Sequence, residues 1–226
     1  TFTSVNILID DTLIDVSTVA ELQAMTSGYA YRLVNDIDLK DVNWTPLDQF
    51  SGYFDGNGFK ITNFTVVSTF IDEHVYIGLF SSLDGAIIKN LAIDNVFISV
   101  NMTSEVNQQY SSYIGILTPY LRSYNYITNV HITGEIVLRN NTNGSVRLGG
   151  LAAYTSSYNT LSKNSFNGQI TNESTTEYPY IGGLIGVLSS SNIKQSFSNV
   201  TLVSQGQYLG GLIGQATNSR LENVYS

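Results

Sequence analysis

The chain repeats itself, and the spacing of the repeats limits the folds that it can adopt. Five segments share an order of one aromatic or long side chain, one apolar residue, one or two glycines and further apolar residues. They start at Tyr76, Tyr113, Arg147, Tyr180 and Tyr208, which lie 37, 34, 33 and 28 residues apart. A regular period in this range indicates a solenoid, a propeller or another stacked array.

Each repeat also contains a second apolar run, which starts about ten residues after the first segment. These runs are Ile87–Val100, Ile127–Leu138, Leu161–Thr171, Ile193–Val203 and Leu221–Ser226. They are rich in β-branched and aromatic residues and are punctuated by Gly, Asn and Ser, which is typical of strands joined by turns. Helical repeats need longer runs with a 3.6-residue period, and a propeller blade needs about 40–50 residues. The sequence therefore predicts an all-β fold, a parallel β-helix.

Two kinds of residue recur where the chain is expected to turn. The pairs Gly182-Gly183 and Gly210-Gly211 lack a Cβ, so they allow a tight corner or a close approach of two backbones. Asn90, Asn129 and Asn223 recur two residues into the second run, where Gln195 matches them and Lys163 does not. Stacked amides at one corner can hydrogen-bond to one another along the axis of a solenoid.

The first 70 residues lack the repeat and read as an N-terminal cap with opening strands. Thr18 and Glu21 have capping-box spacing within Val16–Met25, which predicts one short helix that ends near Gly28. A strand is expected over Tyr31–Leu39. We therefore divide one continuous domain into a cap at 1–70 and β-helix coils at 71–226. The last coil is incomplete in this sequence, and its edge is expected to continue or to meet a partner.

The sequence also resembles the GLUG-motif surface proteins over roughly residues 15–226. The resemblance rests on Arg32–Leu39, Trp44–Leu47 and Phe50–Gly58 as an opening segment, and on units such as Tyr180–Gly186 followed by runs such as Leu221–Ser226. It implies a right-handed parallel β-helix on secreted or surface-anchored proteins that are often adhesin-like. It implies no catalytic residue.

Composition excludes several classes of function. The net charge is -8, only 12% of residues are charged, and cysteine is absent. An acidic chain lacks the basic surface that nucleic acid or an anionic membrane requires, so we expect no nucleic-acid partner and no membrane insertion. Without cysteine, disulfides, thiolate catalysis and cysteine-based zinc sites are excluded. We expect no cofactor.

A carbohydrate-active enzyme, either a polysaccharide lyase or a glycoside hydrolase, is the alternative function. Such an enzyme needs paired carboxylates, or an acidic calcium site beside a basic residue. Asp36 and Asp38 would share one face of the strand at 31–39, with Arg32, Lys40 and Lys60 nearby in the sequence. The two aspartates are weak candidates for a metal or catalytic site. The favoured expectation is that they are structural and that the protein has no catalytic residue.

The segments between the runs carry two further signals. Seven Asn-x-Ser/Thr motifs are candidate glycosylation sites if the source is a eukaryote: Asn43, Asn63, Asn101, Asn140, Asn143, Asn172 and Asn199. Tyrosines gather in 110–113, 120–126 and 154–158, which we expect to be loops able to stack on sugars or to contact a protein.

We therefore expect a secreted, non-enzymatic structural or adhesion module at the cell surface or outside the cell. It would form a β-helical rod that can stack into filaments, because a heterologous contact that does not close generates a fibre. The expected partners are further copies of the chain, a neighbouring surface protein or carbohydrate.

Overall fold

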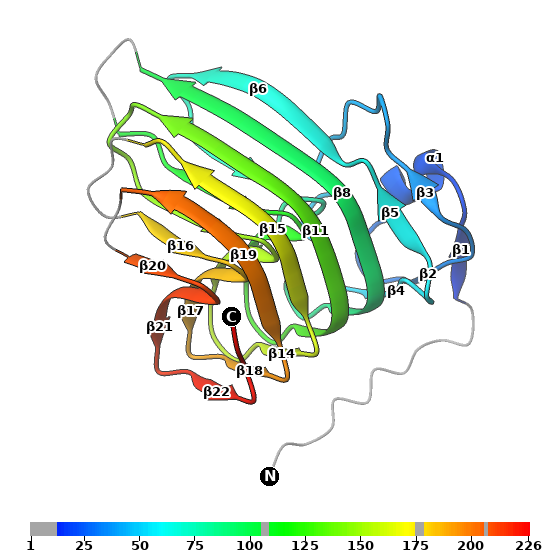
Figure 1. The fold of residues 1–226 in the computed structure, drawn as a ribbon. Helices are drawn as coiled ribbons and strands as arrows, with labels where there is room; N and C mark the ends of the chain where they lie inside the picture. Colours follow the sequence, from blue (N-terminus) through cyan, green and yellow to red (C-terminus); the bar gives the residue numbers. More distant parts are fainter. Residues whose placement is uncertain (1–12, 105–108, 175–178, 206–207) are drawn as a thin grey trace.

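The computed structural model describes residues 13–104, 109–174, 179–205 and 208–226, and it consists almost entirely of strands (Figure 1). The one helix of the described part is α1, Val19–Gln23. The strands form three sheets, here called sheets 1, 2 and 3. Sheet 1 contains β1 Ile14–Val16, β2 Ala30–Leu33, β3 Ile37–Asp38, β4 Tyr53–Asp55, β5 Lys60–Thr62, β6 Thr65–Ile71, β8 Ile87–Thr103, β11 Tyr126–Asn140, β14 Thr160–Ser162, β15 Ser165–Asn172, β18 Asn192–Lys194, β19 Phe197–Ser204 and β22 Arg220–Glu222.

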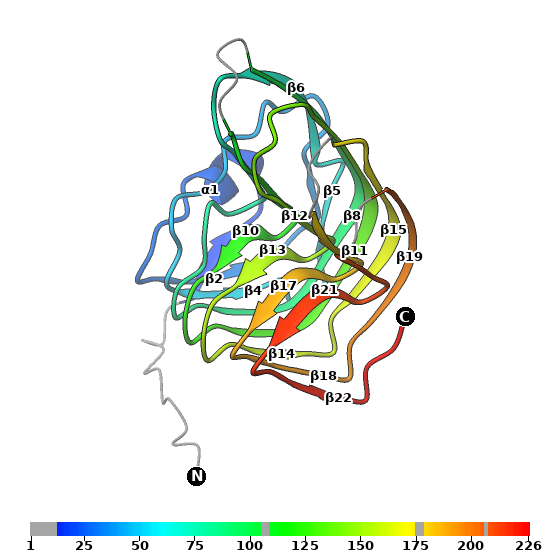
Figure 2. The same cartoon turned by 90° about the vertical axis from the view of Figure 1, so that its left-hand side faces the viewer.

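The two smaller sheets are made of short strands. Sheet 2 contains β7 Val75–Ile77, β9 Ser112–Gly115, β12 Val146–Gly149, β16 Tyr180–Gly182 and β20 Tyr208–Gly210. Sheet 3 contains β10 Thr118–Leu121, β13 Ala152–Thr155, β17 Ile185–Ser189 and β21 Ile213–Thr217. Figure 2 shows the strands of sheet 3 side by side.

The chain visits the sheets in a fixed order. From β9 of sheet 2 it runs to β10 of sheet 3, then to β11 of sheet 1, and it returns to sheet 2 at β12. Each later circuit adds a strand to every sheet, and the long strands β8, β11, β15 and β19 therefore lie next to one another in Figure 1. Parallel strands need such long connections, because a short hairpin joins only antiparallel ones.

The five repeat starts lie next to one another in register. Tyr76 pairs with Tyr113, Tyr113 with Arg147, Arg147 with Tyr180, and Tyr180 with Tyr208. These pairings, like those of the other sheets, are parallel. The structure thus confirms the predicted all-β class with parallel sheets, and it confirms that the look-alike segments are neighbours in space.

Alternation along the short strands places apolar side chains inside and tyrosines outside. In β7, Ile77 is 5% exposed while Tyr76 is 45% exposed. Ile114, Leu148 and Ile181 continue the inner row and are fully or almost fully buried. Because a side chain of this size gains about 1.5–3 kcal/mol from burial, a continuous inner row supplies much of the stability that a single short strand lacks.

The N-terminal part contains the predicted helix, and it also extends the stack. Thr18 Oγ1 accepts a hydrogen bond from Glu21 N (3.2 Å), and the Glu21 carboxylate accepts one from Thr18 N (3.0 Å), so the capping box is confirmed. The expected strand over 31–39 is interrupted, because β2 ends at Leu33 and β3 begins at Ile37. The strands β1, β2 and β4 pair in the same parallel row as β8. Parallel stacking therefore already begins within the segment that the sequence assigned to a cap, although the domain division itself stays a prediction.

The glycine that ends strands β9, β12, β16 and β20 of sheet 2 lies against the backbone of sheet 3. A Cβ on Gly182 would overlap the carbonyl oxygen of Ile185 and would lie 2.6 Å from Gly214 N. Glycine at this position lets two sheets meet without a side chain between them. The close backbone approach expected from the glycine pairs is thus confirmed at Gly182.

A second corner is built from residues in the left-handed backbone region. Asn90, Asn129, Lys163, Gln195 and Asn223 have φ values of 52°, 56°, 56°, 49° and 52°. Asn129 Nδ2 donates to Asn90 Oδ1 at 3.0 Å, which confirms the predicted amide contact at these two levels. Asparagine tolerates this backbone conformation better than most residues, because its short polar side chain can bond locally.

Lys163 is the least suited member of this corner, and replacing it should stabilise the chain. We expect Lys163→Asn to raise the free energy of unfolding by about 1 kcal/mol, because lysine carries a left-handed backbone penalty that asparagine partly avoids. Urea denaturation at neutral pH measures the change. The control is Lys194→Asn on strand β18, which has no positive φ and should give no gain. An equal gain in both variants would contradict the explanation.

A buried row of polar side chains runs along the inside of the stack. Asn125 and Asn159 are 1% and 0% exposed. Asn125 N and Nδ2 both donate to Asn159 Oδ1, at 3.0 and 2.9 Å, and Asn159 N donates to Ser191 Oγ at 3.2 Å. Asn159 Nδ2 in turn donates to the carbonyl oxygen of Arg122 at 2.7 Å. The side chains thereby satisfy backbone groups at a bend where the ladder between strands is interrupted.

Candidate binding surface

Two rows of outward side chains meet where sheets 2 and 3 join. The row on sheet 2 contains Tyr76, Tyr113, Arg147, Tyr180 and Tyr208. The row on sheet 3 contains Tyr120 and Tyr154, which pair in register. These seven side chains are here called the tyrosine–arginine face. Outer side chains of the two sheets contact one another. The outer surface is therefore concave where sheets 2 and 3 join.

The rings of the tyrosine–arginine face pack closely. Tyr113 and Tyr120 have ring centroids 5.0 Å apart and planes 19° apart, and Tyr120 lies 5.8 Å from both Tyr76 and Tyr154. Further along the same row, Tyr180 and Tyr208 are stacked at 4.9 Å. Burial, followed by the neighbouring Tyr76 and Tyr154, raises the pKa of Tyr120. Its phenol therefore stays protonated and able to donate a hydrogen bond at neutral pH.

Arg147 interrupts the tyrosine row at its centre. Its guanidinium carbon lies 4.5 Å from the ring centroid of Tyr113, 5.3 Å from that of Tyr154 and 5.7 Å from that of Tyr180. Cation–π contacts of this kind are worth more when the cation is partly desolvated. Burial lowers the pKa of Arg147, although a guanidinium remains charged at any physiological pH. The tyrosine–arginine face thus offers one cation framed by three rings.

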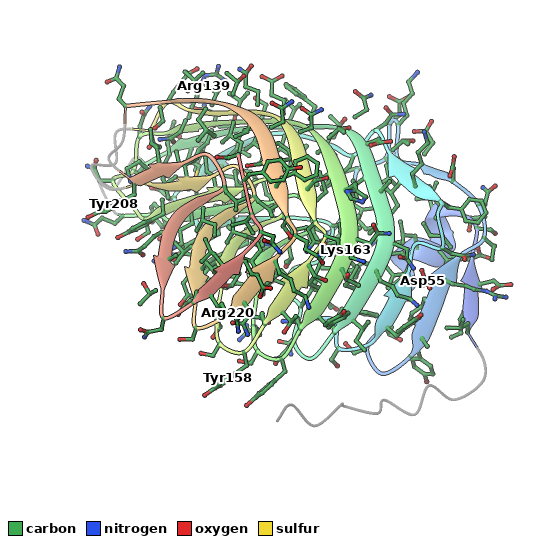
Figure 3. All side chains as sticks on the ribbon, turned by 60° about the horizontal axis from the view of Figure 1, so that its bottom comes forward. Asp55, Arg139, Tyr158, Lys163, Tyr208 and Arg220 are labelled. Atoms are coloured by element: carbon green, nitrogen blue, oxygen red, sulfur yellow. The ribbon has the colours of Figure 1, made fainter. Side chains whose placement is uncertain are left out.

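The tyrosine segments expected to be loops are strands in part. Tyr113, Tyr120 and Tyr154 lie on β9, β10 and β13, so the expectation was wrong for these three rings. Tyr110, Tyr124 and Tyr158 lie outside the strands, as expected. Tyr124 and Tyr158 differ from them: both have positive φ, both are about two-thirds exposed, and their rings stack at 5.2 Å. Figure 3 shows Tyr158 projecting from the ribbon, away from Tyr208.

The carboxylates of Asp36 and Asp38 accept hydrogen bonds from neighbouring residues of the fold. Asp36 Oδ1 accepts a hydrogen bond from Lys60 N at 3.0 Å. Asp38 Oδ1 accepts from Asn63 Nδ2 at 2.7 Å and from Lys40 N at 2.9 Å, and these two contacts lower the pKa of Asp38. Asp36 lies between β2 and β3, and Asp38 ends β3, so the two residues do not belong to one continuous strand. In the described ranges there is no group of three or more acidic or histidine side chains placed to hold a metal ion.

Asp55 forms a denser polar cluster that the sequence suggested only as a turn. Its carboxylate accepts hydrogen bonds from Asn57 N (2.8 Å), Asn90 Nδ2 (3.0 Å) and the Tyr53 hydroxyl (3.1 Å), and it lies 3.1 Å from Lys89 Nζ. Burial raises the pKa of Asp55, but the contacts with Asn90, Asn57 and Lys89 outweigh it, so the net pKa is lowered. This cluster holds the corner between β4 and β5.

Neutralising Asp55 should lower stability in a pH-dependent way. Because the folded pKa is depressed, the carboxylate contributes fully above its unfolded value of about 4, and the contribution is lost as the pH falls through the folded value. We expect Asp55→Asn to lower the free energy of unfolding by about 1–2 kcal/mol at pH 7 and by less below pH 4. Urea denaturation at both pH values checks this. The exposed Asp48→Asn is the control, and a deficit that is equal at both pH values would contradict the argument.

The seven candidate glycosylation sites differ in accessibility. Asn43, Asn143 and Asn199 are exposed, and Asn63 and Asn101 are half-buried. Asn140 is fully buried, with Nδ2 donating to Ser112 Oγ and Oδ1 accepting from Thr142 N. Asn172 is 5% exposed and donates to Ser204 Oγ. The burial argues against Asn140 and Asn172 as acceptors in the folded chain. Glycosylation at the other five sites stays a prediction.

Arg147 and the buried asparagine row were missed by the sequence analysis. Arg147 was noticed only as the member of the repeat that replaces tyrosine. The alignment of the repeats already placed Arg147 in register with Tyr113 and Tyr180. An arginine at a position that is tyrosine in the other four repeats was the signal that could have identified it. Asn125 and Asn159 carried no comparable signal, since asparagine is common throughout the chain.

Together the fold and this surface define an all-β protein of stacked parallel strands with an outer tyrosine–arginine face. No protein-family model matches the chain. It is 30% identical over 116 residues to a protein of Evansella cellulosilytica named "Putative Gly-rich membrane protein", and the match covers 46% of this chain and 12% of that protein. The chain thus spans only a small part of that relative. Within the described residues, no helix has the length and apolar character that crossing a membrane requires.

A solved structure shares the fold. It is described as a "putative immunoglobulin A1 protease" from Bacteroides ovatus, and it superposes with a TM-score of 0.68 at 20% sequence identity. The superposition covers 95% of this chain and 65% of that one, so the chain also spans less than two thirds of this protein. At this identity the likeness concerns the fold alone.

Proposed function

We propose that the chain is a non-enzymatic adhesion module of a secreted or cell-surface protein, built as a right-handed parallel β-helix. The tyrosine–arginine face carries the proposal. Tyrosine is enriched at binding surfaces because it combines a large ring with a polar end. A rigid stack of strands that repeats such rings at one position supplies an extended contact surface without a deep pocket. Parallel crossovers are almost always right-handed, which supports the proposed hand.

Two further observations favour adhesion over catalysis. The candidate carboxylates Asp36 and Asp38 already bond to backbone and side-chain groups of the fold. A hollow beside Asp38 is lined by Lys40, Asp41, Val42, Asn43, Asn63 and Thr65, of which Asn63 donates to Asp38. One acid in that lining does not provide the pair of carboxylates that glycoside hydrolysis uses.

A saccharide array tests the proposal. We expect the purified chain to bind at least one class of saccharide and to release no reducing ends or unsaturated products. Tyr154→Ser with Tyr180→Ser should abolish binding, because both rings belong to the tyrosine–arginine face. Tyr124→Ser with Tyr158→Ser is the matched control and should bind like the wild type, since that stack lies at another corner.

Two outcomes would contradict the proposal. Equal loss of binding in both double variants would show that the tyrosine–arginine face is not the contact surface. Turnover of a saccharide would establish the alternative, a carbohydrate-active enzyme. In that case Asp36→Asn with Asp38→Asn should abolish product release if those residues catalyse. Circular dichroism of each variant confirms that the strands remain folded.

We also propose that copies of the chain associate end to end, as the sequence predicts. The outermost described strands β20 and β22 expose Leu209 and Leu221, which are 39% and 45% accessible. Electron microscopy of the purified chain should show particles longer than one molecule. Uniform single molecules at high protein concentration would contradict this part of the proposal.

A further inference from the structure

The charge of Arg147 has no counter-charge in the described part of the chain. Arg32, Arg139 and Arg220 pair with Asp15, Glu173 and Glu222 at 2.6, 3.0 and 3.3 Å. Arg122 forms no ion pair among the described residues either, but it is exposed. Arg147 has no such ion pair among the described residues, and its Nε is buried without a hydrogen-bond partner. A half-buried cation that meets only aromatic rings interacts more strongly with an incoming anion than an exposed one does, because the local dielectric is lower.

The ligand group that fits Arg147 is a carboxylate. A guanidinium presents several N–H donors in one plane, which matches the two oxygens of a carboxylate. The tyrosines around it leave one cation at the centre of the face, so the geometry suits a single acidic group flanked by neutral contacts. The overall charge of -8 disfavours a densely charged polyanion.

The surroundings of Arg147 favour a saccharide over a peptide. Strands β12 and β13 are central in their sheets, since each pairs with a strand on both sides. A peptide therefore finds no free strand edge on which to add its backbone. The rings recur with the spacing of successive strands, about 4.8 Å, which is close to the length of one sugar unit in a linear chain. Phenol hydroxyls and ring edges suit the hydroxyls and C–H groups of such a chain.

We propose that Arg147 binds the carboxylate of an acidic saccharide lying along the tyrosine–arginine face. This inference rests on the proposed adhesive function and adds the chemical class of its ligand. Tyr113 is buried beside the guanidinium, so the exposed Tyr76 on one side and Tyr208 on the other contact the neighbouring sugar rings. The guanidinium selects the unit that carries the acid.

Binding to matched acidic and neutral probes tests the inference. The probes are 3′-sialyllactose and a xylotriose that carries one glucuronate branch, each with a single carboxylate and each compared with its own methyl ester by calorimetry. At least one acid should bind about tenfold or more tightly than its ester, as expected for a charge-assisted hydrogen-bonded pair. Arg147→Gln should remove that difference. Arg139→Gln, which breaks a paired arginine on β11, should retain it.

Four results would overturn the inference. Equal binding of acid and ester by the wild type would exclude carboxylate selection, and no binding of either acid would do the same. Equal loss in Arg139→Gln would show that overall charge, not Arg147, matters. Binding of a triglutamate peptide as tightly as the acids would show that the ligand class is wrong. If the wild type binds acid and ester equally and Tyr154→Ser with Tyr180→Ser abolishes binding of both, the adhesive function stands while the carboxylate inference falls.

Discussion

Replacing Asn159 by alanine is expected to lower the free energy of unfolding by about 4 kcal/mol. Asn159 is fully buried, and its side chain accepts from Asn125 N and Nδ2 and donates to the carbonyl oxygen of Arg122. Alanine would remove the partners of Asn125 N and of the Arg122 carbonyl oxygen, while Asn125 Nδ2 keeps its hydrogen bond to the Leu83 carbonyl oxygen. Each buried group that loses its partner costs about 1–3 kcal/mol. The affected groups lie on two successive circuits, so the damage extends beyond the mutated strand.

Urea denaturation of Asn159→Ala and of Asn167→Ala measures this effect. Asn167 is exposed and contacts only Asn199 Nδ2 in the described part of the chain, at 3.2 Å. Its replacement should change the free energy of unfolding by less than about 0.5 kcal/mol. If Asn159→Ala costs less than about 1 kcal/mol, the buried polar row is not a structural element of the protein.

Gly182→Ala is the second large effect, with an expected loss of about 3 kcal/mol. The added methyl group would overlap the carbonyl oxygen of Ile185 and crowd Gly214 N. Both are backbone atoms held between paired strands, so neither can move without shifting sheet 3. Overpacking of this kind costs about 1–3 kcal/mol when neighbours can adjust, and more when they cannot.

The control for Gly182→Ala is Gly211→Ala. A Cβ on Gly211 would meet only Ser226 Oγ and Cβ. The hydroxyl can turn away, and Cβ can move with the backbone of Ser226, which lies outside the described strands. Thermal unfolding followed by circular dichroism should therefore show a large fall in Tm for Gly182→Ala and a small one for Gly211→Ala. The same small fall in both would mean that sheets 2 and 3 do not approach as closely as described.

The repeat made much of the fold predictable. Tyr76, Tyr113 and Tyr180 precede an apolar residue and a glycine in the same order, and a side chain that recurs at one position of a stacked repeat must occupy one row. Thr18 and Glu21 were equally informative, because capping depends on a few neighbouring residues. Local order therefore sufficed for the strand pairing of the repeats and for the helix.

Other features depend on contacts that no local pattern encodes. The strands β1, β2 and β4 extend sheet 1 without carrying the repeat motif, because pairing needs only backbone groups and a buried face. Asn140 matches a glycosylation motif, yet its amide is buried by contacts with Ser112 and Thr142. That Arg147 forms no ion pair with a described residue is visible only when the circuits are stacked. Such features depend on which residues come close together in the folded chain, and these residues are far apart in the sequence.

The central claim is that successive repeat starts lie side by side in register, and engineered disulfides test it most directly. The chain has no cysteine, so a bridge can form only between introduced thiols. Cysteines at Tyr180 and Tyr208 replace paired neighbours, and adjacent strands place their Cα atoms within the range of about 4.4–6.8 Å that a disulfide allows. Cysteines at Tyr158 and Tyr208, which lie at separate corners (Figure 3), form the control pair. Mass spectrometry after mild oxidation should find the intramolecular bridge in the first variant and not in the second. A bridge in the control, or none between positions 180 and 208 in the folded protein, would contradict the stacked arrangement.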